Sequence, residues 1–183
     1  IKAAGIPFTT ASVNRFAPID GVAERAGANH SIIQRTLDEK LETIEGAYSG
    51  HVPVTAIISM AQLVHASMIG AAAVVMSNED SANYPTRLAD GREVNHQYSK
   101  SLECEILIQA VVAEATADSI QYFSLLRPLN ELQIAQRFSE LREFHDVFIS
   151  CNKAFRQDPQ ARHKTWCGEC SKCEFAFLIL APF

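Results

Sequence analysis

Hydrophobic positions along the chain form two kinds of pattern. Short stretches rich in β-branched and apolar residues predict strands at 7–14, 30–37, 72–77 and 121–126. The segments between them carry apolar residues three and four positions apart, which is the spacing of an α-helix. Strands that alternate with helices are typical of parallel βαβ units, so the pattern predicts an α/β domain built on a parallel sheet.

Proline and glycine mark where two of these helices begin and end. Pro18 near the start and Gly27 just past the end predict a helix over 18–26. Pro53 and Gly70 bound a longer helix. Its apolar residues repeat at helical spacing: Val54, Ile57, Ile58, Ala61, Val64 and Met68.

Two further helices and one long polar segment complete the pattern. A helix is predicted over 99–115, and a shorter one follows Pro128 and continues or restarts toward Phe148. The apolar stripe of the first of these comprises Leu102, Ile106, Ala110 and Ala113. The segment 78–97 is polar and rich in turn-forming residues, and ordered loops of this length tend to be functional.

The first five residues, "IKAAG", indicate the last turn of a helix that Gly5 caps, and a predicted strand follows at once. A parallel sheet whose first element is the end of a helix lacks a preceding strand. We therefore expect this sequence to be a fragment with a strand and a loop upstream.

Composition narrows the class of protein and its partners. With 183 residues, 48% of them hydrophobic and 20% charged, the chain can bury a core without disulfides. Its net charge of −5 argues against binding a nucleic-acid backbone, so small molecules or proteins are the expected partners. No apolar run is long enough to predict a membrane span, and no secretory n-region precedes an apolar h-region in this sequence, so we expect a cytoplasmic protein with reduced thiols. The sequence does not indicate an oligomeric state.

Four of the five cysteines cluster near the end of the chain with the spacing C-x15-C-x2-C-x2-C: Cys151, Cys167, Cys170 and Cys173. Reduced cysteines at this spacing favour a metal site, and four thiolates suit a structural Zn²⁺ ion best. An iron–sulfur cluster and unligated or redox-active cysteines are the alternatives. Cys104 falls inside a helical pattern and is predicted to be a small buried hydrophobic residue.

Polar residues that could carry chemistry follow the third predicted strand and precede the helix at Pro53. Asn78 and Glu79 lie at the carboxyl end of the strand, where open α/β sheets bind ligands; the alternative is a hydrophilic turn. His51 and Thr55 flank a helix start, where free N–H groups favour an anion. The alternative there is simple capping with a solvated histidine.

A third polar group lies at the start of the helix predicted at 99. At helical spacing His96 and Lys100 share a face, as do Lys100 and Glu103, so they could transfer protons or hold phosphate. Asn95 and Ser99 adjoin them. The alternative is a capped helix start with an ordinary Lys100–Glu103 pair. The chain has no Gly-x-Gly-x-x-Gly, Walker-type or Gly-x-Ser-x-Gly motif, which disfavours the usual dinucleotide folds, P-loop NTPases and α/β-hydrolases.

Six segments in order carry a resemblance to a known family: "GHVPVTAIIS", "VVMSNEDSAN", "GREVNHQYSKSLECE", "YFSLLRPLNELQIA", "SCNKAF" and "WCGECSKCEFAFLILAPF". From about Gly50 to Phe183 the chain resembles the UDP-N-acetylmuramoyl-L-alanyl-L-glutamate epimerases, the MurL family. That family is similar to the PP-loop adenine-nucleotide hydrolases, including 7-cyano-7-deazaguanine synthase with its four-cysteine zinc site.

This resemblance implies an α/β fold of the PP-loop (HUP-like) kind, with helices on both faces of a parallel sheet. It implies a partial PP-loop-like domain over 1–149 and a zinc-binding segment over 150–183, with the four clustered cysteines as zinc ligands. The Ser-Gly-Gly-x-Asp-Ser-like loop that grips ATP phosphates in such proteins is not in the sequence. We expect that loop upstream, and we expect the fragment alone to bind ATP poorly and to be inactive.

The implied reaction is ATP-dependent epimerisation of the terminal L-glutamate of UDP-MurNAc-L-Ala-L-Glu for peptidoglycan synthesis, through an acyl-adenylate with Mg²⁺ at the phosphates. The expected partner is thus this UDP-linked dipeptide, and neither nucleic acid nor a membrane. Glu79, His96 and Lys100 are the candidate catalytic residues. The candidate contacts to substrate or ATP are His51, Thr55, Asn78, Asn95 and Ser99. The alternatives are a PP-loop ligase or nitrile synthase, and a zinc-clasped binding module without catalysis.

Overall fold

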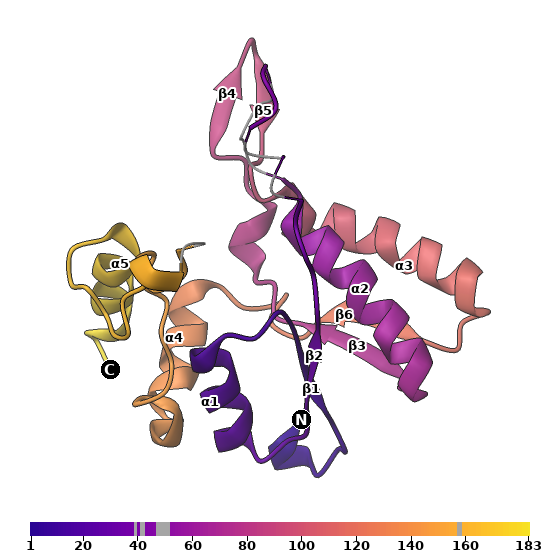
Figure 1. Ribbon diagram of the computed structural model, residues 1–183, viewed down its shortest axis with the longest axis horizontal. Helices are drawn as coiled ribbons and strands as arrows, with labels where there is room; N and C mark the ends of the chain where they lie inside the picture. The colour runs from indigo at the N-terminus through magenta and orange to yellow at the C-terminus, as the bar shows by residue number, and fades with distance from the viewer. Residues whose placement is uncertain (39, 41–42, 47–51, 157–158) are drawn as a thin grey trace. The chain divides into compact units, whose positions relative to one another are not determined.

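The computed structural model describes residues 1–38, 40, 43–46, 52–156 and 159–183 (Figure 1). The chain divides into two compact units, one made of residues 1–32 and 131–183 and the other of residues 33–130. Each unit has its own cluster of buried side chains.

The unit of residues 33–130 contains a two-stranded parallel sheet and two long helices. Its elements are α2 (Val54–Ile69), β3 (Ala73–Met76), the 3₁₀ helix η3 (Asp80–Asn83), β4 (Arg87–Ala89), β5 (Arg92–Val94), the 3₁₀ helix η4 (Tyr98–Lys100), α3 (Leu102–Thr116) and β6 (Gln121–Ser124). Strands β3 and β6 pair in parallel, with Val74 beside Tyr122. The strands predicted at 72–77 and 121–126 are thus confirmed with slightly shorter bounds.

Local chemistry explains where the two helices end and begin. Helix α2 stops at Gly70, which adopts the left-handed conformation with φ 67° that glycine tolerates best, as the sequence predicts. Helix α3 starts at Leu102, three residues later than the sequence predicts. Its N-cap is Ser101, whose Oγ accepts the N–H of Cys104 at 3.2 Å. Residues 98–100 form η4 instead.

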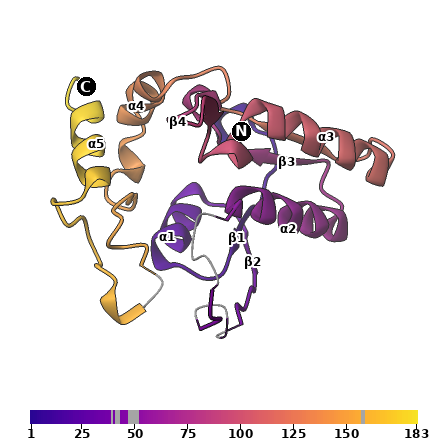
Figure 2. The ribbon, with the colours of Figure 1, turned by 90° about the horizontal axis from the view of Figure 1, so that it is seen from above.

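Both helices pack on the same face of the sheet. The buried cluster joins Leu63 and Ala66 of α2, Ile108 of α3 and Tyr122 of β6, with Val74 against it. Because Val74 and Tyr122 are neighbours in register, their side chains lie on one face. Figure 2 shows α2 and α3 flanking β3 when the sheet is seen from the helix side.

The faces of the helices differ from those the sequence predicts. Val64 and Met68 of the predicted stripe on α2 are 64% and 80% exposed, and Ile106 on α3 is also exposed. Leu63, Ala66, Ile108 and Val112 are buried instead, together with Cys104, whose predicted burial is confirmed. Both helices are apolar on most sides, so apolar spacing alone could not identify the buried face.

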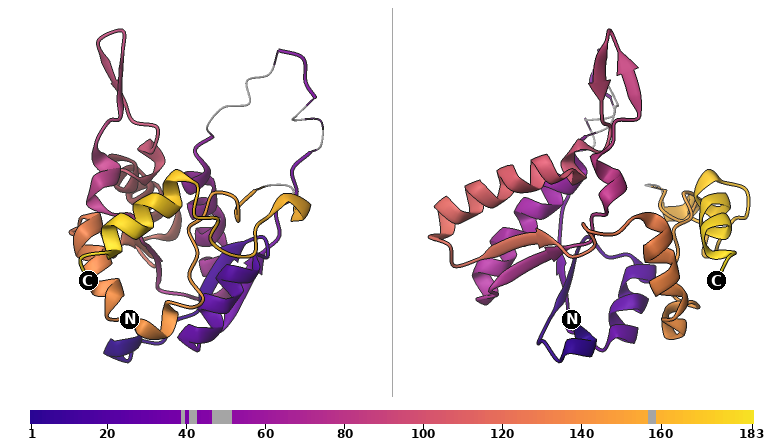
Figure 3. Two further views of the ribbon diagram at one scale, coloured as in Figure 1. Left: turned by 90° about the vertical axis from the view of Figure 1, so that its left-hand side faces the viewer. Right: turned by 180° about the vertical axis from the view of Figure 1, so that it is seen from behind.

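An antiparallel hairpin interrupts the segment predicted as a polar loop. Strands β4 and β5 pair through Leu88 and Glu93, and Asp90 and Gly91 form the turn between them. Both turn residues have positive φ, 49° and 72°, as a two-residue type I′ turn requires. Figure 3 shows this hairpin extending away from α2 and α3.

The other unit contains three α-helices among its described residues. Its elements are the 3₁₀ helix η1 (Lys2–Ala4), β1 (Thr10–Val13), α1 (Ala17–Ala26), β2 (His30–Ile33, whose last residue belongs to the other unit), α4 (Glu131–Ser139), the 3₁₀ helices η5 (Arg142–Phe144) and η6 (Pro159–Ala161), and α5 (Ser171–Leu180). Strand β1 pairs with β2, helix α1 ends at Gly27 as predicted, and α4 packs against α5. The sequence analysis did not predict α5.

The mixed α/β class, the parallel strand pairing and the C-terminal cysteine cluster are confirmed. A single sheet with helices on both faces stays a prediction. Within the described ranges, no helix combines the length and apolar character that crossing a membrane requires.

Candidate functional site

The four clustered cysteines converge on one point. Cys151 lies in a loop, Cys167 precedes Gly168, Cys170 is the N-cap of α5 and Cys173 lies in its first turn. Gly168 has φ 72°, which lets the chain reverse between the two cysteines that flank it. All four Sγ atoms lie within 4.8 Å of one another. The predicted clustering is therefore confirmed.

The sulfur separations fit a tetrahedral metal site. Three of them are 3.8 Å for Cys167–Cys173, 3.9 Å for Cys170–Cys151 and 3.4 Å for Cys170–Cys173. A tetrahedron with Zn–S bonds of about 2.3 Å has edges of about 3.8 Å. Cys151 and Cys173 are fully buried and Ala154 nearly so, whereas Cys167 and Cys170 are half-buried, so the protein encloses most of the site. A site closed in this way suits a structural ion.

The electrostatics of the cluster also favour a cation. Burial opposes ionisation of Cys170, but backbone N–H groups of Cys173 and Asn152 and two neighbouring thiols outweigh it and lower the pKa of Cys170 to about 6. Burial and the surrounding sulfurs raise the pKa of Cys173 to about 11. The pKa of Cys151 is also lowered, because hydrogen bonds from backbone N–H groups outweigh its burial. A cation would offset the negative charge that accumulates as the remaining thiols ionise.

A second group of polar residues lies where β3 and β6 end. The side chain of Asn78 is buried, and its Nδ2 donates to Ser124 Oγ at 3.0 Å, which joins the two strand ends. Glu79 precedes η3, and its side-chain Oε1 accepts a long hydrogen bond of 3.4 Å from Ser81. Open parallel sheets bind ligands at the carboxyl ends of their strands. Asn78 and Glu79 therefore lie where a ligand contact is expected.

Lys100 and its neighbours lie in η4, which packs against η3 and α2. Lys100 Nζ donates to Gln97 Oε1 at 3.1 Å. The amide of Asn95 donates to Ala82 O and accepts the N–H of Gln97, each at 2.8 Å, so it ties η3 to the start of η4. Ser99 is half-buried in η4.

His96 and Lys100 do not share a helical face. Ser101 has extended backbone angles and begins α3, so residues 96–103 do not form one continuous helix, and that premise of the sequence analysis is wrong. His96 is exposed, and its Nδ1 lies 2.8 Å from Thr86 Oγ1, next to the base of the hairpin.

Thr55 lies in the first turn of α2, the helix that packs against η4. Its backbone carbonyl accepts a hydrogen bond from Ser59 Oγ at 2.8 Å. His51, the remaining predicted contact, lies outside the described residues.

Sequence reasoning missed the two charged residues that connect this group. Arg127, just after β6, donates to Glu105 Oε2 at 2.7 Å, to Lys100 O at 2.8 Å and to Glu79 O at 2.9 Å. The side chains of Arg127 and Glu105 are only 12% and 6% exposed. The available signal was Glu105 among the apolar residues of α3, because a buried glutamate needs a partner.

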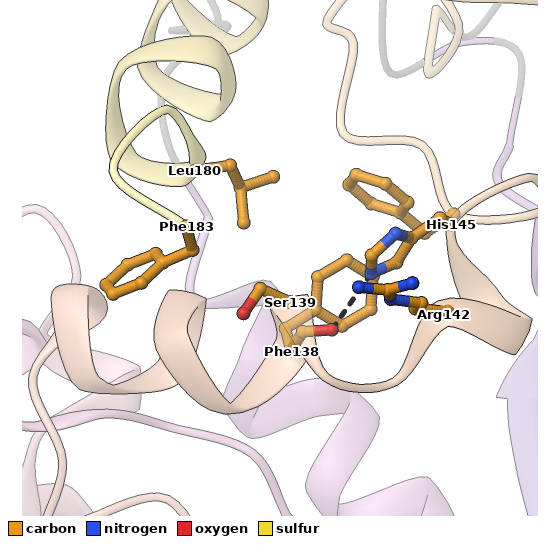
Figure 4. A pocket seen from close by; sticks show the side chains of 7 residues that line it. Phe138, Ser139, Arg142, His145, Leu180 and Phe183 are labelled. Atoms are coloured by element: carbon orange, nitrogen blue, oxygen red, sulfur yellow. Dashed lines mark hydrogen bonds between the residues drawn. The ribbon is translucent and has the colours of Figure 1, made fainter.

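A cavity of about 380 Å³ lies between α4 and α5 in the other unit (Figure 4). Arg142 and His145 face it, together with Phe138 and Leu180. His145 Nε2 is already bonded to Phe138 O at 3.0 Å, and none of the residues predicted from the sequence lines this cavity.

Comparison with known proteins connects these features. Residues 1–125 match the MurL N-terminal domain, and residues 147–183 match the MurL C-terminal domain. A UDP-N-acetyl-alpha-D-muramoyl-L-alanyl-L-glutamate epimerase from a Micromonospora species is 41% identical over 100% of this chain, which corresponds to 41% of the relative. The enzymes of the same name from Salinispora tropica and Xanthomonas oryzae pv. oryzae are 41% and 38% identical over 97% and 100% of the chain, and over 38% and 41% of their own lengths.

The chain thus spans about two fifths of the length of the curated relatives it matches. The matched domains together include the strand ends, η3, η4 and the four cysteines. The resemblance in the sequence is confirmed, and the chain belongs to the MurL family.

Proposed function

We propose that this protein epimerises the terminal L-glutamate of UDP-N-acetylmuramoyl-L-alanyl-L-glutamate. The observation that carries the proposal is identity of 38% to 41% over nearly the whole chain with three enzymes that bear the name of this activity. Because the chain covers about two fifths of those enzymes, the activity of the whole protein is inferred from theirs.

The chemistry of the substrate requires activation. Removing the Cα proton beside a carboxylate places a second negative charge next to the first. If ATP adenylates the carboxylate and releases pyrophosphate, the first charge is removed and the Cα proton becomes far more acidic. A base then takes this proton, an acid returns one to the opposite face, and water hydrolyses the acyl-adenylate to the D-glutamyl product and AMP. Mg²⁺ would screen the phosphates.

Glu79, His96 and Lys100 are our candidates for the base and the acid. Two observations support Glu79 and Lys100: Glu79 follows the carboxyl end of β3, and Arg127, just after β6, binds the backbone carbonyl of both residues. His96 is exposed and adjoins the same segment. Asn78, Asn95, Ser99, Thr55 and His51 are proposed as contacts to substrate or ATP.

We also propose that residues 1–149 contribute to an α/β domain of the PP-loop kind and that residues 150–183 bind structural Zn²⁺. The parallel pairing of β3 with β6 and the geometry of the four sulfurs support this division. Under this proposal the zinc ion holds the start of α5 and takes no part in the reaction.

The assignment of the base can be tested with Glu79→Gln, His96→Asn and Lys100→Met in the protein as its gene encodes it. Each substitution removes the proton-transfer group, and those at Glu79 and Lys100 nearly preserve the size of the side chain. A variant that lacks the base or the acid should lose at least about 100-fold in kcat, the range typical of general acid–base groups. Glu114→Gln, on an exposed position of α3, is the matched control and should retain wild-type kcat. Normal epimerisation by all three variants would overturn the assignment.

A further inference from the structure

The guanidinium of Arg127 connects three segments of the unit formed by residues 33–130. It donates one hydrogen bond to the loop before η3, one to the end of η4 and one to α3, through Glu79 O, Lys100 O and Glu105 Oε2. All three distances lie between 2.7 and 2.9 Å. Few side chains can do this, because only arginine carries five donors on one rigid planar group.

Glu105, the charged partner, is itself fully bonded. Its Oε1 accepts the backbone N–H of Ser124 at 3.1 Å, and its Oε2 accepts the hydroxyl of Ser124 as well as Arg127. Asn78 in turn donates to the same hydroxyl. A continuous chain of hydrogen bonds therefore runs from Asn78 through Ser124 and Glu105 to Arg127.

Stability alone does not account for a buried ion pair at this place. Desolvating both charges opposes folding, and well-packed apolar residues often replace such pairs without loss of stability. A Leu–Met pair could join α3 to β6, but it could not bind two backbone carbonyls. What the ion pair adds is a defined position for those two carbonyls.

The two carbonyls belong to the residues before η3 and at the end of η4. Arg127 binds their backbone and leaves the side chains of Glu79 and Lys100 in other environments, near Ser81 and Gln97. The pair thus fixes the backbone positions of Glu79 and Lys100 without binding the side chain of either residue.

We infer that Arg127 and Glu105 are positioning residues of the candidate active site, which set the separation between Glu79 and Lys100. The inference rests on the proposed function, because it assigns the pair a role in that reaction. Neither residue is assigned a contact with substrate. The hydrogen bonds to Glu105 outweigh its burial and lower the pKa of its carboxyl, so it is ionised at neutral pH and keeps the arginine oriented.

Arg127→Lys and Glu105→Gln test the inference in the protein as its gene encodes it. Lysine keeps the charge but places its donors on one nitrogen, so it cannot hold all three acceptors in place. We expect kcat to fall by about 10- to 100-fold with KM changed less than about threefold, since a displacement of about 1 Å can cost 100-fold in rate. Glu105→Gln keeps one acceptor oxygen, so its kcat should fall less than that of Arg127→Lys.

Tyr122→Phe is the matched control. It removes the buried hydrogen bond of 2.8 Å to Ser59 in the same core but touches neither Glu79 nor Lys100. It should lower the melting temperature and leave kcat unchanged at a temperature well below melting. Wild-type kcat in Arg127→Lys would overturn the inference. So would an equal loss of kcat in Tyr122→Phe, because the effect would then follow stability alone.

Amide hydrogen exchange separates failure of this inference from failure of the proposed function. In Arg127→Lys, exchange should rise at residues 79–83 and 98–101, whereas Tyr122→Phe should leave these segments protected. A wild-type protein that does not epimerise its proposed substrate would refute the proposed function, and this exchange pattern would still decide whether Arg127 positions both segments. Unchanged exchange in Arg127→Lys would overturn the positioning role directly.

Discussion

At the scale of single residues, hydrogen bonds of buried polar groups join the segments of the candidate site. The sequence identified Asn78, Glu79 and Lys100 from their places after a strand and before a helix, and the structure brings these segments together at the strand ends. It did not identify Glu105 or Arg127. Their partnership depends on a contact between a helix and the residues after a strand, which no local pattern contains.

The ionisation of Glu105 leads to a prediction about how stability depends on pH. Hydrogen bonds from Ser124 and Arg127 outweigh the effect of burial and hold the pKa of this carboxyl below its usual value. The resulting stabilisation is fully present above the unfolded-state pKa of about 4.3 and is lost as pH falls through the lower folded-state pKa. Denaturant unfolding below about pH 4.3 should therefore show stability falling with pH more steeply in the wild type than in Glu105→Gln. Parallel curves for the two proteins would contradict this account.

Removing one partner of the Arg127–Glu105 pair should lower the free energy of unfolding more than removing both. Arg127→Met leaves a buried carboxylate without its cation, which typically destabilises a protein by about 3–5 kcal/mol. The double variant Arg127→Met/Glu105→Leu should recover much of that loss, as chemical denaturation at pH 7 can measure. A double variant no more stable than Arg127→Met would contradict this prediction. It would show that the loss in Arg127→Met does not come from the unpaired carboxylate of Glu105.

At the scale of elements, the sequence predicted the ends of helices correctly where a glycine determines them. Gly27 and Gly70 end helices as expected, and the strands predicted from β-branched runs are present. The hairpin β4–β5 was missed although Asp90–Gly91 is a strong turn signal, because its strands are short and exposed. The buried faces of α2 and α3 could not be derived, since both helices are apolar on most sides.

The N-cap of α3 supplies a prediction at this scale. Ser101 is buried, and its hydroxyl satisfies the free N–H of Cys104. Ser101→Ala should lower the free energy of unfolding by about 0.5–2 kcal/mol, whereas Ser101→Asp should retain most of it, because aspartate also caps helices. Ser67→Ala, at an exposed position of α2, is the control and should be neutral or slightly stabilising, since alanine has the higher helix propensity. Equal effects of Ser101→Ala and Ser67→Ala would exclude the cap.

At the scale of the whole molecule, two compact units each supply one candidate centre. Residues 33–130 hold the polar group at the strand ends, and the other unit holds the four cysteines. The spacing of the cysteines predicted their clustering correctly, because two-residue gaps with a glycine between Cys167 and Cys170 allow few other arrangements. The domain boundary at 149 and 150 stays a prediction.

Metal analysis tests the cysteine centre. We expect about one zinc ion per chain, as four thiolates with no open position should bind zinc and not exchange it readily. Cys173→Ser should lose the metal, and Cys104→Ala should retain it because Cys104 lies in the core of α2 and α3. Visible absorbance from iron in place of zinc would contradict the assignment, and so would a full zinc content in Cys173→Ser.

Epimerisation itself is the central claim, and proton exchange at the glutamyl Cα tests it most directly. The protein as its gene encodes it would be incubated in heavy water with UDP-N-acetylmuramoyl-L-alanyl-L-glutamate, ATP and Mg²⁺, and mass spectrometry would follow deuterium and AMP. The account predicts one deuterium at the glutamyl Cα of the D-product, with AMP formed alongside. AMP without deuterium would contradict it and indicate a ligase, and a substrate left unchanged would contradict both the reaction and its dependence on ATP.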